Sequence, residues 1–144
     1  MMINMRPTYE TTHDLTREQA VAEKLTQAWG CEVVKTPPKA PYDYCALRDG
    51  LVSAIVEIKV RNNKSNKYPT FMLSLDKVSN CSLHSGTIGC PLIIVVQYTD
   101  KLKYWMFNRD DYSVGIGGRT DRGDSQDVEP VIYVPINKFK VIGE

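Results

Sequence analysis

The stretch DYCALRDGLVSAIVEIK, residues 43–59, decides the fold of this chain. Two strand-like runs, residues 43–47 and 51–61, flank a short Arg-Asp-Gly segment. Asp-Gly between such runs is a strong signal for a β-hairpin, because the favoured tight turns need residues that tolerate positive φ angles. The sequence therefore predicts two antiparallel strands that place Asp43 alongside the end of the second strand.

Two charged side chains in the second strand carry the chemical signal. Strand side chains alternate between faces, so Glu57 and Lys59 project to one side and Val56 and Ile58 to the other. Charged groups on a central strand cost free energy unless they are paired or functional. Two carboxylates beside a lysine suit phosphodiester hydrolysis, since they can hold Mg²⁺ and orient a water molecule. A simple salt bridge between Glu57 and Lys59 is the alternative, because Glu-x-Lys triplets are common.

A first helix is predicted between a capping box at Thr16 and Gln19 and a terminal glycine, Gly30. Its apolar stripe recurs at helical spacing, and it comprises Ala22, Leu25 and Trp29. Glu18 falls within about 40° of that stripe on a helical projection, so we expect it to face inward. Compensation of the helix dipole in the first turn is its alternative role.

The remaining segments alternate between strands and one further helix. We expect strands at residues 31–35, 70–73, 92–98 and 101–108, a helix at 74–85 capped by Ser74, a mobile loop at 113–129 and one or two strands within 131–142. This order predicts an α/β (α+β) fold in which helices flank a central mixed β-sheet. With 144 residues, the chain is expected to form one domain, 1–144.

Composition narrows the function classes. No run approaches the roughly 18 apolar residues of a membrane span, and no secretory pattern opens the chain, so we expect a cytoplasmic protein without a membrane partner. The four cysteines lack C-x-x-C spacing and are expected to be reduced thiols. Net charge is only +1, but residues 59–67 carry four positive charges and no acid, whereas 109–129 carry six acids against three arginines. The basic stretch is compatible with a nucleic-acid contact or with solvated lysines.

The order Glu18, Gly30, Asp43, hairpin and Glu57-Ile-Lys59 resembles the PD-(D/E)xK nuclease superfamily. It is similar to archaeal-type Holliday junction resolvases and to related phage and restriction-type endonucleases over residues 12–108. Tyr42 stands where the motif has its proline. The near-neutral charge departs from the strongly basic resolvases and leaves the substrate open.

This resemblance implies a restriction-endonuclease-like sheet and a site that binds Mg²⁺, with Mn²⁺ as a substitute. Its metal ligands would be Asp43, Glu57 and the carbonyl of Ile58, with Glu18 supporting a second metal and Lys59 orienting the water. DNA contacts would come from the basic side chains of Arg61, Lys64, Lys67 and Lys77. The expected function is that of a DNA endonuclease, either a Holliday junction resolvase or another structure-selective enzyme. It would act as a homodimer on branched or duplex DNA. Its expected location is the cytoplasm, or the host cytoplasm if it is phage-encoded. A non-catalytic nucleic-acid-binding or structural protein on the same fold, or an RNA nuclease, are the alternatives.

Overall fold

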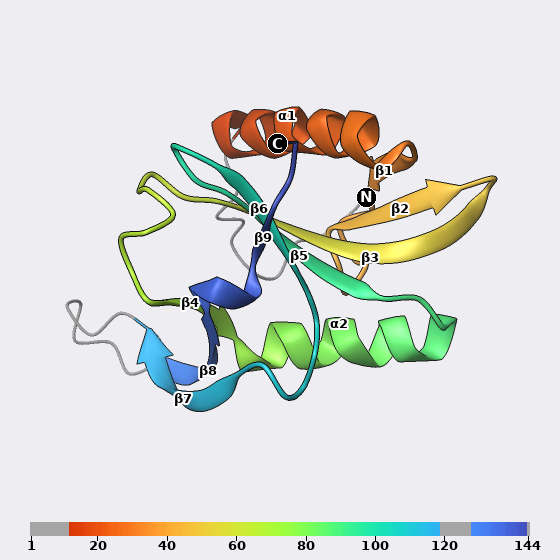
Figure 1. Cartoon of the computed structure of the whole chain (residues 1–144). Coiled ribbons are helices and arrows are strands. Elements are labelled where there is room, and N and C mark those ends of the chain that lie inside the picture. Colours follow the sequence, from red (N-terminus) through yellow and green to blue (C-terminus); the bar gives the residue numbers. More distant parts are fainter. Residues whose placement is uncertain (1–11, 119–127, 144) are drawn as a thin grey trace.

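A computed structural model describes residues 12–118 and 128–143, and a six-stranded sheet forms the centre of this part of the chain. Helix α1 (Thr12–Trp29) covers one face of the sheet, and helix α2 (Leu75–Ile88) covers the other (Figure 1). The sheet has the order β1-β2-β3-β5-β6-β9, built from β1 (Glu32–Lys35), β2 (Tyr44–Arg48), β3 (Leu51–Val60), β5 (Leu92–Gln97), β6 (Leu102–Met106) and β9 (Lys140–Val141). A second sheet beside α2 has the order β4-β8-β7, built from β4 (Thr70–Ser74), β8 (Val128–Pro135) and β7 (Ser113–Gly118). The predicted fold class is confirmed, since β3 pairs antiparallel with β2 and parallel with β5.

The hairpin predicted from the Asp-Gly signal joins β2 and β3. Both turn residues have positive φ, 54° at Asp49 and 77° at Gly50, which the tight hairpin turn requires. In the register of the two strands Tyr44 pairs with Val56, so Asp43 lies one step further along, opposite Glu57. The pair lies at the carboxyl end of β3, which is an interior strand of the large sheet.

Side-chain alternation along β3 divides the hydrophobic core in two. Val56 and Ile58 pack against α1, in a cluster that includes Val21 and Leu25. Ile55 belongs to the other cluster, which lies between the large sheet, α2 and the second sheet. Because Glu57 and Lys59 share the face of Ile55, the fold directs them towards α2.

The two helices differ from their predicted bounds at one end each. Helix α1 begins at Thr12 rather than at Thr16, so the predicted capping box is wrong: the helix continues through the residues that were expected to cap it. The Ser74 cap of α2 is confirmed, because its Oγ accepts a hydrogen bond from the Lys77 amide at 3.4 Å. This helix continues past residue 85 to Ile88, where Gly89 ends it with a φ of 84°.

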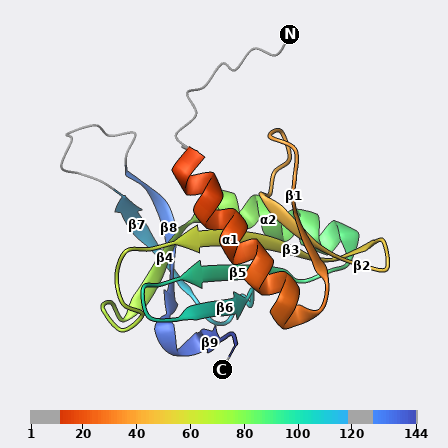
Figure 2. The ribbon, with the colours of Figure 1, turned by 90° about the horizontal axis from the view of Figure 1, so that it is seen from above.

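Part of the predicted loop at 113–129 is a strand. Residues 113–118 form β7, which pairs antiparallel with β8, and residues 119–127 lie outside the described part of the chain. The glycines that suggested a loop allow close packing instead, because a Cβ at Gly115 would lie 2.8 Å from the Tyr133 ring. A Cβ at Gly117 would lie 2.8 Å from the Met72 sulfur. Figure 2 shows β7 and β8 side by side, at one side of the large sheet.

Among the described residues, no helix has the length and apolar character needed to span a membrane.

Candidate functional site

Two carboxylates meet where the hairpin brings the start of β2 against the end of β3. Glu57 is 1% exposed, and its Oε1 accepts a hydrogen bond from the Asp43 amide at 3.2 Å. Its Oε2 is buried and has no hydrogen-bond partner among the described residues. An ionised oxygen left unpaired in the interior is costly, and such an exception calls for a ligand or a special role.

Lys77 bridges the two carboxylates from the first turns of α2. Its Nζ lies 3.5 Å from Asp43 Oδ1 and 3.6 Å from Glu57 Oε1. Burial disfavours the charged ammonium, but attraction to Glu57 and Asp43 outweighs burial and raises the pKa of Lys77. The structure thus brings Lys77, which was expected to contact DNA, into the centre of the acidic pair. One feature of the sequence could have indicated that Lys77 pairs with carboxylates. A lysine at a helix N-terminus opposes the helix dipole and needs a negatively charged partner nearby.

Cys81, one helical turn beyond Lys77, also contacts the site and was not anticipated. Its buried thiol donates towards Glu57 Oε1 at 3.5 Å and lies 3.6 Å from the Pro41 carbonyl oxygen. Burial, followed by the adjacent Glu57 carboxylate, raises the pKa of the Cys81 thiol to about 12. The thiol therefore stays protonated at neutral pH and acts as a weak donor rather than as a nucleophile.

Lys59 follows Glu57 on the same face of β3 and is half-buried. Burial and the negative charge of Asp43 raise the pKa of Glu57, while Lys59 and Lys77 oppose this rise. Asp43 and Lys59 therefore both lie close enough to Glu57 to influence its pKa, so the structure brings these three predicted residues together. The Ile58 side chain faces α1, and the role of its carbonyl as a ligand stays a prediction.

Glu18 lies on α1, which covers the opposite face of the sheet from the Glu57 side chain. Glu18 is nevertheless at the same end of β3 as the acidic pair. The neighbouring Arg17 shows this, since it donates a hydrogen bond to Asn62 Oδ1, just beyond β3, at 2.9 Å. Within residues 12–118 and 128–143, no three carboxylate, histidine or cysteine side chains group as a metal site. The support of a second metal by Glu18 stays a prediction.

The other predicted DNA contacts lie on the segment that leaves β3. Arg61, Lys64 and Lys67 are exposed. This segment is fixed to the β5–β6 turn, because Asp100 accepts hydrogen bonds from the amide and the hydroxyl of Ser65 at 2.8 and 3.0 Å. The basic side chains thus project from an anchored loop that begins where β3 ends.

The donor set fits a magnesium ion. Mg²⁺ is usually held by one or two carboxylates and keeps several water molecules or phosphate oxygens. Asp43 and Glu57 supply the two carboxylates, and the open Glu57 Oε2 is an acceptor that a cation would satisfy. Lys77 Nζ lies within 3.6 Å of one oxygen of each carboxylate and offsets part of their negative charge.

A helix-flanked sheet with this acidic pair and Glu-x-Lys strand defines the restriction-endonuclease-like fold of PD-(D/E)xK proteins. The profile of a family described as "Phage putative PDDEXK endonuclease" matches residues 4–142, and the chain belongs to this family.

A solved Holliday junction resolvase, Hjc of the archaeal hyperthermophile Archaeoglobus fulgidus, shares the fold. It has a TM-score of 0.50 and 17% sequence identity, over 78% of this chain and 85% of that chain. A comparison with curated proteins gave no match.

Proposed function

We propose that this protein is a Mg²⁺-dependent endonuclease that hydrolyses phosphodiester bonds in DNA. The observation that carries the proposal is the buried Glu57 carboxylate, which faces Asp43, keeps one oxygen open and shares its strand face with Lys59. Membership of the phage PDDEXK endonuclease family supports the same reading. Mn²⁺ is expected to substitute for Mg²⁺.

Each residue has a distinct task in this proposal. Asp43 and Glu57 hold the metal, with the Ile58 carbonyl beside them, and Glu18 supports the arrangement from the other side of the strand end. When bound, the metal polarises the phosphate and makes a coordinated water more acidic. Lys59 orients the attacking water and stabilises negative charge that develops on the phosphate oxygens.

The proposed substrate is branched or duplex DNA, bound by a homodimer. The exposed side chains of Arg61, Lys64 and Lys67 beside the acidic pair supply positive charge for phosphate contacts. The similarity in fold to a Holliday junction resolvase supports a branched substrate.

Cleavage assays on labelled four-way junction, flap, nicked and duplex DNA with Mg²⁺ test the proposal. We expect Asp43→Ala and Lys59→Ala each to lower the cleavage rate by about 100-fold or more, because removing one charge-stabilising group in an active site typically has that effect. Circular dichroism would establish that the variants fold. Asp110→Ala and Lys140→Ala, which change exposed charges elsewhere, are the matched controls and should cleave normally. Full activity in Asp43→Ala would refute the assignment.

A second candidate is a nucleic-acid-binding protein without catalysis. It is favoured by one observation: Lys77 lies within 3.6 Å of both carboxylates and offsets part of their negative charge. Calorimetric titration with Mn²⁺ discriminates the two: no heat of binding in the wild type, together with intact DNA binding, would favour this candidate.

A further inference from the structure

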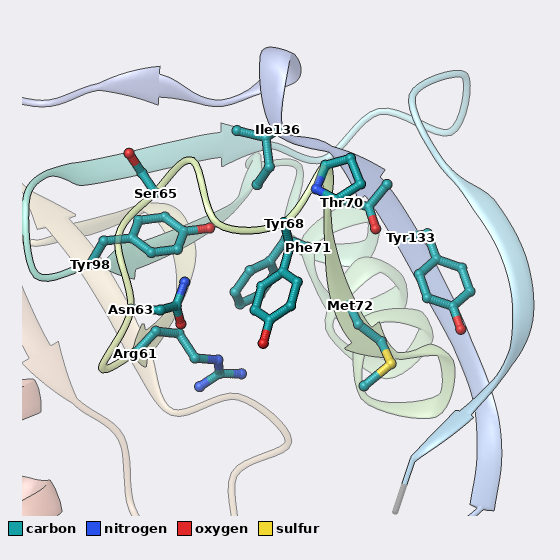
Figure 3. A pocket seen from close by; sticks show the side chains of 11 residues that line it. Arg61, Asn63, Ser65, Tyr68, Thr70, Phe71, Met72, Tyr98, Tyr133 and Ile136 are labelled. Atoms are coloured by element: carbon teal, nitrogen blue, oxygen red, sulfur yellow. The ribbon is translucent and has the colours of Figure 1, made fainter.

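A cavity of about 370 Å³ lies between the segment that leaves β3 and the second sheet (Figure 3). Its walls are mainly aromatic and apolar, and they comprise Tyr68, Phe71, Met72, Tyr98, Tyr133 and Ile136. Arg61 and Asn63 add polar groups along one wall. In Figure 3 the ends of Arg61, Tyr68 and Met72 point to the same side of the cavity, with Tyr68 between the other two.

The cavity and the acidic pair share two strands. Along β3 and its continuation, Arg61 follows Lys59 by two residues, which is about 6.6 Å of extended chain. On the other side, β4 lines the cavity at Met72 and ends at Ser74, which caps the helix carrying Lys77. Glu57 of the acidic pair lies four residues before Arg61, about 13 Å of extended chain, which matches about four steps of a nucleic-acid strand at 3.4 Å each.

The wall of the cavity presents flat groups to solvent. Tyr68 is 56% exposed and Met72 is 43% exposed, although both are large apolar side chains. The Arg61 guanidinium lies over the Phe71 ring, with Cζ 5.1 Å from the ring centroid. The Phe71 ring is itself fixed by an edge contact with Tyr98 at a centroid distance of 6.4 Å. Aromatic rings and guanidinium planes are the surfaces on which unstacked bases are held.

Positive charge surrounds these rings. Lys67 Nζ lies 5.3 Å from the centroid of the Tyr68 ring, and Arg61 lines the same cavity. Such a combination favours a ligand that carries an aromatic base and a phosphate together over an uncharged apolar ligand. A base within an intact duplex is stacked and cannot enter a pocket, so only an unpaired or extruded base fits.

We propose that this cavity, the Tyr68 pocket, receives one unpaired nucleobase of the DNA strand, about four nucleotides from the scissile phosphate. The inference rests on the proposed nuclease function and specifies its substrate class: DNA with an unpaired or readily unstacked nucleotide close to the cut. Tyr68 and Arg61 supply the stacking surfaces, and Lys67 contacts the adjoining phosphate.

Binding measured without catalytic metal tests the pocket independently of cleavage. The probes are two fluorescently labelled duplexes of one sequence, one fully paired and one with a single unpaired thymidine, titrated by anisotropy in EDTA. We expect wild type to prefer the unpaired probe by about fivefold or more, since base–aromatic stacking contributes about 1–3 kcal/mol. Tyr68→Ala should lose this preference and keep the affinity for the paired probe, whereas Tyr68→Trp should retain it. Leu51→Ala, at the far end of β3 and 73% exposed, is the matched control and should behave as wild type.

A crosslinking experiment locates the base directly. The unpaired thymidine is replaced by 5-iododeoxyuridine, which is irradiated in the complex and mapped by mass spectrometry. An adduct on Tyr68, Phe71 or Tyr133 supports the pocket, and an adduct only outside the cavity overturns it. Equal affinity of the wild type for the two probes also overturns the proposal. So does a Tyr68→Ala variant that changes its oligomeric state but still prefers the unpaired probe, because the Tyr68 ring would then contact a second copy of the chain. Wild-type protein that shows the probe preference but no Mg²⁺-dependent cleavage would refute the nuclease proposal alone, so the two failures are distinguishable.

Discussion

Glu57 is an ionisable residue in a well-packed core, where burial makes its charged form unfavourable. Its carboxylate is buried beside a second carboxylate, and both features raise its pKa. The charged form is tolerated because the Asp43 amide, the Cys81 thiol and the Lys77 ammonium surround Oε1. These contacts leave Oε2 open, so stability and cation binding compete at the same side chain.

Lys77 is expected to compete with a metal ion for this acidic pair. In Lys77→Met the pair loses its counter-ion, so the metal-free protein should be less stable by on the order of 1 kcal/mol, a value kept small because the lysine is partly solvent-exposed. The same loss should tighten Mn²⁺ binding about fivefold, since the metal no longer has to displace an ammonium group. Urea unfolding and calorimetric titration measure the two effects.

Lys140→Met removes an exposed positive charge on β9 and serves as the control. If Lys77→Met weakens Mn²⁺ binding while the control leaves it unchanged, Lys77 helps to hold the metal and the competition is disproved.

At the scale of elements, the loop between β3 and β4 carries both the basic side chains and part of the Tyr68 pocket. Its position depends on a contact far away in sequence, from Ser65 to Asp100 in the β5–β6 turn. The hydrogen bonds from Ser65, led by the bond from its amide, hold the pKa of Asp100 below its usual value of 3.8. The loop is thereby tied to the large sheet through one carboxylate.

Asp100→Asn should weaken this tie in a pH-dependent way. Because the folded pKa is depressed, the carboxylate stabilises the fold fully above about pH 3.8, and this contribution is lost as the pH falls through the folded pKa. The variant should therefore unfold at lower urea concentration than wild type at pH 7, and the difference should shrink below pH 3.8. Asp110→Asn, at another exposed aspartate, is the control. An unchanged difference between pH 7 and pH 3 would contradict the role assigned to Asp100.

At the scale of the molecule, the sheet separates an apolar layer under α1 from a layer under α2 that contains the acidic pair. Figure 1 shows the two helices on opposite faces, with the second sheet extending the layer under α2. The layer under α1 is built from apolar side chains that need no ligand. The layer under α2 combines core packing with a buried charge, so metal binding should affect the stability of the whole domain.

Glu57→Gln is expected to stabilise the metal-free protein by on the order of 1 kcal/mol at pH 7. A raised folded pKa means that the ionised carboxylate opposes folding above its unfolded pKa, and the neutral amide removes that cost. Mg²⁺ should raise the melting temperature of wild type through preferential binding to the folded state, and should leave the variant unchanged. Thermal unfolding with EDTA and with Mg²⁺ measures both effects. A variant that is less stable in EDTA would contradict this account of Glu57.

The sequence alone determined the hairpin, the apolar stripe of the first helix, the Ser74 cap and the meeting of Asp43 with Glu57. Each follows from a local rule: positive φ at Asp-Gly, helical spacing, side-chain capping and the alternation of strand faces. It could not predict β7, because its glycines are required by close packing against Tyr133 and Met72, which lie far away in the chain.

The tertiary structure decided which side chains share the site. Local periodicity places Glu18 and Glu57 each on an inward face, but it does not say which helix packs on the face of Glu57. The helix that packs on that face is α2, and it brings Lys77 and Cys81 to Asp43 and Glu57 across more than 20 residues of sequence. The chemical character of Asp43, Glu57 and Lys59 can thus be recognised within a 17-residue stretch of sequence. The side chains that contact them depend on which helix packs on each face of the large sheet.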